Sequence, residues 1–445
     1  MDNEKSVETV NVATVDDVLD MCKGSRRYQW SGLLGAGLLY MTPMSGIQPM
    51  INLLLIEEGV GIPLEVASRS MSLYYIGCAA AFPIIGPLFD VYGRYRMSVV
   101  VATAVLATSC GCTMAALQGL VPALYGLRFL QGMAVAGGVP CYTYALEAHH
   151  SRDQAYVGAF LQFGYAGICL ACAAACHFGL RDFAIVSLVF GALPVAIGLA
   201  FAIAGTESLP YLVAKRRWHE ARIVAQEIAS WNRVQTPSRI VWKGENEDSD
   251  STFRHAAEMA VDHWGLMRRL FFACVPWMAV GFSYWGLSYS ARNISSEPFL
   301  NILLLTGVDA IANFVYPVLA HTSSTMFMQI SSFALAGASF YFATRLPDAV
   351  LSCVLVARFA ISLAFTAVYQ STAEQFPGQF RGTAFGFTSF MERICSSFAP
   401  TLSLLPLNVS LGISSGACLL ACLATQCLYS LPPPETITFQ YRKYA

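Results

Sequence analysis

The stretch that decides the fold is GPLFDVYGRYR, residues 86–96. It is a short charged turn with two glycines, and it lies between two apolar runs that are each long enough to cross a lipid bilayer. We expect Gly86 to let two helices approach closely and Gly93 to adopt a backbone angle that other residues avoid. Asp90 and Arg94 place opposite charges at the helix ends, where an ion pair can form. The stretch therefore predicts a tight hairpin between two membrane-spanning helices.

The composition of this 445-residue chain is that of a membrane protein. Hydrophobic residues make up 56% of it and charged residues 12%, whereas soluble domains carry about 25% charged residues. The mean hydropathy is +0.52. A formal net charge of −1 argues against nucleic acid as a partner. The polar first residues lack the basic-then-apolar order of a cleaved signal, so we expect the N-terminus to be retained and cytosolic.

Twelve apolar runs have the length of a membrane-spanning helix. We expect the spans at residues 30–55, 68–89, 97–117, 122–145, 156–177, 182–204, 269–290, 299–320, 325–344, 349–370, 383–405 and 409–430. With a cytosolic N-terminus, this even number returns the C-terminus to the cytosol. Most arginines and lysines then fall in loops on the cytosolic side, as the positive-inside rule requires. The sequence predicts an all-α membrane protein.

The expected spans form two pseudo-symmetric six-helix bundles. The expected domains are a cytosolic N-terminal segment (1–29), the first bundle (30–204), a cytosolic loop with an amphipathic helix (205–268), the second bundle (269–430) and a cytosolic tail (431–445). An internal repeat relates the bundles, with matching positions at Arg128 and Arg358, Tyr142 and Tyr369, and Glu147 and Glu374. Two such units in parallel order, with substrate held between them near the midplane, are typical of facilitator-type transporters.

The charged turn at 86–96 resembles the loop between the second and third helices of major facilitator superfamily transporters. Further stretches are similar to the organic ion transporter family of that superfamily, the solute carriers for organic cations, anions and zwitterions. They include residues 16–19, 27–29, 128–130, 145–147, 207–212, 284–288 and 369–374. The resemblance covers nearly the whole chain. It implies that the protein is not an enzyme but a secondary transporter, which moves small organic ions across a lipid bilayer by alternating access between its two halves.

Two features depart from that family. Its members carry a large extracellular domain between the first two helices, and here that link is only residues 56–67. The counterpart of the charged turn in the second half, residues 318–324, lacks the acidic residue, the glycine and the arginines. These departures motivate an alternative, a transporter-like receptor or vesicle protein without net transport. A sugar carrier is a further alternative, and the expected location is the plasma membrane or a vesicle membrane.

Charges at membrane depth are the first candidates for a substrate site, because each costs about 2.5–3.5 kcal/mol on insertion scales. Asp309 lies near the middle of the eighth span, and Glu392 and Arg393 near the middle of the eleventh. Sequence neighbours point about 100° apart on a helix, so Glu392 and Arg393 cannot both face one cavity. The resemblance favours Arg393, because anion carriers of the family place an arginine there and cation carriers an acid.

We therefore expect an organic anion as the substrate. Asn313 weakens this assignment, because many anion carriers have a lysine there. If Asp309 or Glu392 neutralises Arg393, a cation or a zwitterion fits equally well.

Aromatic and amide side chains complete the expected substrate site, because rings hold flat organic ions by stacking and hold cations through the ring quadrupole. The candidates are Gln48, Tyr142, Gln162, Phe163, Tyr284, Trp285, Phe365, Tyr369 and Gln370. Trp277 is expected to serve in packing.

Charged residues at the cytosolic helix ends are expected to act in gating. They are Asp90, Arg94, Glu147, Arg152, Glu374 and Arg381. We expect the ion pair of Asp90 and Arg94 to hold the two halves together when the protein is open to the outside, and Glu147 and Glu374 to form structural ion pairs. The sequence has no metal-ligand spacing, so we expect no metal or cofactor. A coupling ion or a counter-substrate is left open.

Overall fold

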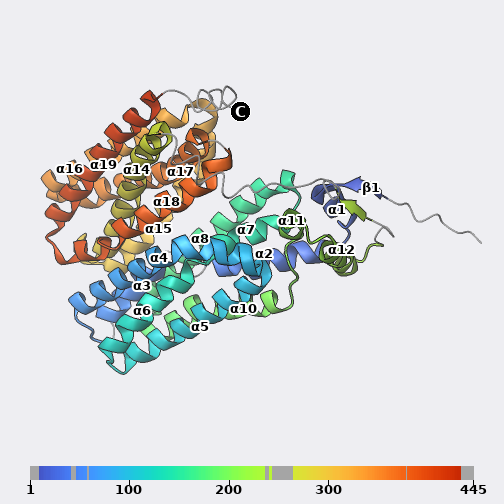
Figure 1. The fold of residues 1–445 in the computed structure, drawn as a ribbon. Coiled ribbons are helices and arrows are strands. Elements are labelled where there is room, and N and C mark those ends of the chain that lie inside the picture. Colours follow the sequence, from blue (N-terminus) through green and yellow to red (C-terminus); the bar gives the residue numbers. More distant parts are fainter. Residues whose placement is uncertain are drawn as a thin grey trace, which may run out of the picture.

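The computed structural model describes residues 10–41, 47–57, 60–235, 240–242, 264–376 and 378–431. These residues form two helical bundles (Figure 1). The N-terminal bundle is coloured from blue to green, and the C-terminal bundle from yellow to red. A small group of helices and strands extends beyond one end of the N-terminal bundle, at the right of Figure 1.

The N-terminal bundle contains the first six expected spans. Its helices are α2 (Arg27–Met41), α3 (Ile47–Glu57), α4 (Leu64–Tyr92), α5 (Arg94–Leu117), α6 (Val121–Val135), α7 (Gly138–Glu147), α8 (Gln154–His177), α9 (Phe183–Val186) and α10 (Leu193–Ile203). A 3-10 turn η1 (Ser151–Asp153) precedes α8, and a π-helical turn η2 (Ser187–Ala192) joins α9 to α10. The spans expected at 30–55 and 122–145 are thus each formed by two helices.

The C-terminal bundle contains the other six expected spans. Its helices are α14 (Trp264–Tyr289), α15 (Pro298–Thr322), α16 (Thr325–Arg345), α17 (Val350–Gln375), α18 (Gly378–Ser396) and α19 (Leu407–Ser430). Short 3-10 turns are η3 (Ser290–Asn293), η4 (Pro347–Ala349) and η5 (Ala399–Leu404). Nine helices in the described part of the chain are long and apolar enough to cross a membrane. The spans at 122–145 and 383–405 are each divided between two helical elements, and the described parts of the span at 30–55 form α2 and α3. With these, each of the expected spans has a helical counterpart.

The two bundles meet through α4 against α18 and through α8 against α15. We call the end of the molecule with residues 90–94 the proximal end, and the end with residues 60–64 and 293–298 the distal end. At the distal end, Ser68 Oγ lies 3.0 Å from Ser403 Oγ, and the hydroxyls of Tyr75 and Tyr289 lie 3.4 Å apart. These contacts join opposite bundles, so the structure is a state closed at the distal end.

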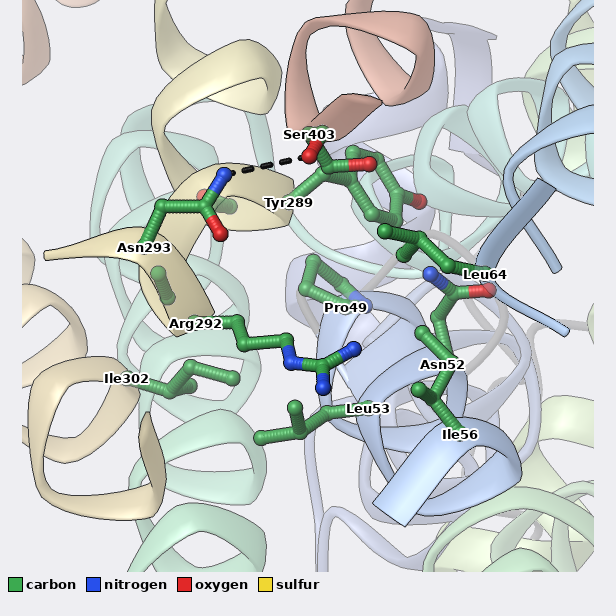
Figure 2. Close-up of a pocket in the computed structure, with 12 residues that line it drawn as sticks. Pro49, Asn52, Leu53, Ile56, Leu64, Tyr289, Arg292, Asn293, Ile302 and Ser403 are labelled. Carbon is green, nitrogen blue, oxygen red and sulfur yellow. Dashed lines mark hydrogen bonds between the residues drawn. The ribbon is translucent and has the colours of Figure 1, made fainter. Parts of the chain in front are cut away.

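A cavity of about 10 Å³ remains at this closed end, which is room for about one water molecule. Figure 2 shows that residues of both bundles line it, with Asn52 and Leu53 on one side and Ile302 on the other. The guanidinium of Arg292 points between them, and Asn293 donates to the Ser403 carbonyl at 3.1 Å (Figure 2).

A second hydrophobic cluster joins the N-terminal segment to the segment between the bundles. Strand β1 (Val10–Ala13) pairs in parallel with β2 (Ile240–Trp242), and α1 (Val15–Met21) shares the cluster with α11 (Leu209–Ala214) and α12 (Trp218–Asn232). The amphipathic helix expected within 205–268 is therefore present as α12. Its apolar face is covered by the N-terminal segment, while residues 243–263 lie outside the described part of the chain.

Charged contacts dock α1 on the turn between α7 and α8. Asp16 accepts hydrogen bonds from the backbone and the hydroxyl of Ser151 at 3.0 and 2.6 Å, and Asp20 accepts one from Arg152 at 2.7 Å. Burial opposes the charged form of Asp16, but the hydrogen bonds from Ser151 outweigh it and lower the pKa of this carboxyl. The N-terminal segment is thereby tied to the first bundle.

Glycines allow α4 and α6 to pack backbone against backbone. A Cβ at Gly77 would overlap with the Phe129 carbonyl, and one at Gly132 with the Tyr74 carbonyl. The close approach predicted at Gly86 is wrong, because a Cβ there would have no atom within 4 Å. The close contact of α4 lies earlier in this helix, at Gly77, which packs against α6 near Gly132.

Gly132→Ala is expected to destabilise the protein by roughly 1–3 kcal/mol, as overpacking does, because backbone cannot move aside as a side chain can. The measurement is the temperature at which the detergent-solubilised protein loses half of its monodisperse peak in size-exclusion chromatography. Gly126→Ala on the same helix is the matched control, since a Cβ there has no atom within 4 Å. Equal melting temperatures for the two variants would contradict the close packing.

Candidate functional site

An ion pair between α15 and α17 holds the centre of the C-terminal bundle together. Arg358 donates from Nε and Nη2 to the two carboxylate oxygens of Asp309, at 2.8 and 2.6 Å. Tyr284 and Ser362 donate to the same carboxylate at 2.9 and 2.5 Å. Arg358 Nη1 donates to the Tyr284 carbonyl and to Ser288, at 2.7 and 2.8 Å. Asp309, which we expected to contact the substrate, is thus occupied by four hydrogen bonds from the protein.

Arg128 occupies the matching place in the N-terminal bundle. It is 2% exposed, and its Nη1 donates to Gln48 at 3.0 Å and to Gln131 at 2.8 Å. Gln131 in turn donates to Ser109 at 2.9 Å. Gln48, another expected substrate residue, therefore links α3 to α6. The two repeated arginines both brace helices, but the partners in this half are neutral amides.

Arg393 differs from these two arginines. Its side chain is 13% exposed, and its Nε lies 3.1 Å from Glu392 Oε2 without the alignment of a hydrogen bond. Its two terminal nitrogens donate to no residue in the described part of the chain. Electrostatic interactions place its guanidinium near Tyr40 of α2, Tyr75 of α4 and Tyr369 of α17. Arg393 therefore lies between the bundles with hydrogen-bond donors to spare.

Aromatic rings form a continuous chain from the C-terminal bundle to α4. Successive ring centroids are 4.5 Å apart for Trp277 and Tyr369, 5.8 Å for Tyr369 and Phe365, 5.7 Å for Phe365 and Tyr284, 5.0 Å for Tyr284 and Trp285, and 5.8 Å for Trp285 and Tyr75. Tyr369 keeps 45% of its surface exposed. The packing role expected of Trp277 is confirmed, since it is 1% exposed and donates to Thr372 at 2.9 Å.

The N-terminal bundle contributes a smaller group around Tyr40. The rings of Tyr40 and Tyr142 are 4.9 Å apart, and Gln162 donates to the Tyr40 hydroxyl at 3.0 Å. Tyr40 interacts electrostatically with Tyr369 and Arg393 of the opposite bundle. The expected residues Tyr142, Gln162, Tyr369 and Arg393 therefore gather around Tyr40. Sequence reasoning missed Tyr40, although a tyrosine inside an apolar span was a usable signal.

Two expected substrate residues lie apart from this group. Gln370 accepts from Tyr316 at 2.8 Å and donates to Glu374 at 3.0 Å, so its amide is used between α15 and α17. Phe163 is 51% exposed next to Gln162 on α8. Gln370, like Gln48 and Asp309, therefore forms hydrogen bonds to other residues of the protein.

The proximal charged turn forms a cluster within the N-terminal bundle. Asp90 and Arg94 pair at 2.9 Å, which confirms the expected ion pair, and Arg94 Nε lies 3.6 Å from Glu147. Gly93 has a φ of +100°, as predicted, and the Glu207 carboxylate lies against it while accepting from the Tyr95 backbone at 3.0 Å. Glu207 is a further residue of the cluster that we did not single out for gating.

The remaining gating candidates bind to residues close to them in the fold. Glu147 pairs with Arg94 and accepts from Ser208 at 2.5 Å, whereas Arg152 pairs with Asp20. Glu374 accepts from Thr325 at 2.6 Å. The side chain of Arg381 lies outside the described part of the chain. None of the described contacts of this set joins the two bundles to each other, and the role of the set in gating stays a prediction.

Two helical bundles of repeated architecture, with charged and aromatic side chains between them, define a facilitator-type secondary transporter. Residues 33–400 match the sequence pattern of the Major Facilitator Superfamily, and the chain belongs to that family. The protein is therefore a multi-pass membrane transporter and not an enzyme. The lipid bilayer is its surroundings.

Similar proteins of low identity include organic cation transporters. An organic cation transporter-like protein of Drosophila melanogaster is 24% identical over 364 residues, which are 76% of this chain and 63% of that protein. The organic cation/carnitine transporter 2 of Homo sapiens is 24% identical over 200 residues, 44% of this chain and 36% of that protein. The chain thus spans less than two thirds of either relative.

Solved structures of similar fold include an inward-open conformation of the xylose transporter XylE from E. coli. It superposes with a TM-score of 0.65 at 13% identity, over 91% of this chain and 96% of that one. At this identity the similarity shows the fold, and it confirms the expected arrangement of the helices.

Asp309→Asn is expected to destabilise the protein by about 3–5 kcal/mol, because it leaves the buried Arg358 without its counter-ion. The double variant Asp309→Leu/Arg358→Met removes both charges, and it is expected to melt close to the wild type in the same chromatographic assay. An Asp309→Asn protein as stable as the wild type would show that this carboxylate is not needed to neutralise Arg358.

Proposed function

We propose that this transporter carries small organic ions with an anionic group, which binds at Arg393. The observation that carries the proposal is that the terminal nitrogens of Arg393 donate to no described residue, although the arginine lies between the bundles. A carboxylate or sulfonate would accept charge-assisted hydrogen bonds from them. The rings of Tyr40 and Tyr369 are suitably close to hold a flat substrate body.

The acids at membrane depth support the same choice. The Asp309 carboxylate already accepts four hydrogen bonds, two of them from Arg358. Glu392 is 2% exposed and lies against α14. Neither carboxylate is open to a cationic substrate in this state, whereas the guanidinium of Arg393 is open to an anion.

A cation or a zwitterion is the second candidate. The names of the relatives include organic cations and carnitine, and the exposed ring of Tyr369 could hold a cationic group through its quadrupole. A zwitterion would use Arg393 for its acidic group and the rings for its cationic group. A sugar would leave the open donors of Arg393 without an ionic partner.

We infer the orientation from the distribution of basic residues. The proximal end carries Arg94, Arg96 and Arg152, and it lies in the cytosol together with the N-terminal segment and the C-terminal tail. The distal end then faces the outside or the vesicle lumen. The state described here would be closed to that side, and the protein would reside in the plasma membrane or in a vesicle membrane.

The double variant Ser68→Cys/Ser403→Cys tests alternating access. Because the two Oγ atoms are 3.0 Å apart, an oxidant is expected to form a disulfide that locks the distal end and stops uptake, and a reductant should restore it. Mass spectrometry identifies the cross-linked peptides. The two single variants show whether native cysteines react instead. Full cross-linking with undiminished uptake would contradict the need for the distal contacts to open.

Arg393→Ala is expected to lower uptake of labelled organic anions by about tenfold or more, which is the loss of one charge-assisted hydrogen bond. Uptake into proteoliposomes of equal protein content is the measurement. Arg393→Lys should retain part of the uptake because it keeps the charge, and Ile394→Ala serves as the neutral neighbouring control. Unchanged anion uptake by Arg393→Ala, or a wild type that moves cations only, would refute the assignment.

A further inference from the structure

The acidic neighbour of Arg393 occupies a place formed for its carboxylate. Glu392 is 2% exposed, and a Cβ at Gly281 on α14 would overlap with Glu392 Oε1. Because Gly281 has no side chain, there is room for this oxygen against α14. Ser396 Oγ donates to the same oxygen at 2.7 Å. The acid is held between α18 and α14.

The negative charge of Glu392 is stabilised less by its arginine than the negative charge of Asp309 is by Arg358. Its Oε2 lies 3.1 Å from Arg393 Nε, but this nitrogen is not aligned for a hydrogen bond. Asp309, in contrast, receives two aligned hydrogen bonds from its arginine. A buried carboxylate is costly unless it is both paired and hydrogen-bonded. The charged form of Glu392 therefore depends on the neighbouring guanidinium.

Arg393 is the only cation among the described groups that face Glu392. The groups that interact with Glu392 are Arg393, Cys395 and Ser396 on α18, Trp285 on α14, Tyr369 on α17 and Cys78 on α4. When an organic anion binds the outer nitrogens of Arg393, two negative groups share one positive charge. A proton on Glu392 restores the balance, because the neutral acid can still hydrogen-bond to Ser396.

We propose that Glu392 is a proton-binding site coupled to anion binding at Arg393, so that one proton accompanies each monovalent anion. The proposal rests on the proposed function. On the side where the anion enters, the carboxylate takes a proton from water and forms an O–H bond. On the other side the anion leaves, the acid gives the proton back to water, and the carboxylate pairs again with Arg393. No net charge crosses the membrane in this cycle.

The experiment uses proteoliposomes, a labelled aromatic sulfonate and a trapped pH-sensitive dye. A sulfonate stays anionic throughout, so its own titration does not contribute. With acid outside, the wild type is expected to accumulate the probe about tenfold per pH unit, as coupling to one proton requires, and to acidify the lumen. Glu392→Gln should lose both effects but keep exchange of labelled for unlabelled probe at equal pH, because its amide is already neutral.

Gly281→Ala is the second variant, and it keeps the test valid if Glu392→Gln does not fold. Its added Cβ displaces the carboxylate, so its response to the pH gradient should fall severalfold. The controls are Glu297→Gln, which changes an exposed acid of the same bundle, and Gly307→Ala, where a Cβ has no atom within 4 Å. Both should accumulate the probe as the wild type does.

The outcomes separate this inference from the proposed function. Exchange by the wild type without any effect of pH, or accumulation by Glu392→Gln equal to that of the wild type, would overturn the proton site and leave anion transport standing. Failure of the wild type to exchange the sulfonate or an aromatic carboxylate would overturn the proposed function, and the proton site with it.

Discussion

The fork between Arg358 and Asp309 is the contact on which the C-terminal bundle depends. Each charge alone is costly at membrane depth, and the pair joins α15 to α17 while Arg358 also donates to the backbone of α14. Arg128 makes the corresponding junction with neutral amides, Gln48 and Gln131. Its charge is therefore not cancelled by an acid among its hydrogen-bond partners. The two halves therefore neutralise their repeated arginines in different ways.

The sequence predicted the helices well because spanning runs are long and the repeat marks equivalent positions. It predicted the pair of Asp90 and Arg94, which are close in sequence, but not partners that are remote in sequence, because these depend on how helices cross. Asp309 is distant from Arg358 in sequence, and only the packing of α15 on α17 brings them together. The angle between Glu392 and Arg393 was predicted from helix geometry, and they do point to different neighbours. Their side chains still approach each other, with Arg393 Nε 3.1 Å from Glu392 Oε2.

The segments outside the bundles were the least predictable part. The amphipathic period of α12 was visible in the sequence. The sequence did not show that the N-terminal segment covers the apolar face of this helix. The strands β1 and β2 are short and have no periodicity to mark them, and the whole N-terminal bundle lies between them in the sequence. Asn232 completes the junction by donating to the Cys22 carbonyl at 2.6 Å and accepting from the Tyr28 backbone at 3.1 Å. These residues are remote in sequence. They are in contact because the folded N-terminal bundle brings the N-terminal segment next to the end of α12.

The balance between the two access states can be argued from the contacts at each end. The distal end is joined by neutral hydroxyl groups, and each such contact is worth about 0.5–1.5 kcal/mol. Closing the proximal end needs contacts of comparable strength between the bundles. Arg94 is already engaged by Asp90 and Glu147 of its own bundle, and residues 318–324 offer no charged counterpart apart from His321. Since neither end holds a strong cross-bundle ion pair among the described residues, modest differences in substrate affinity are sufficient to shift the protein between its states.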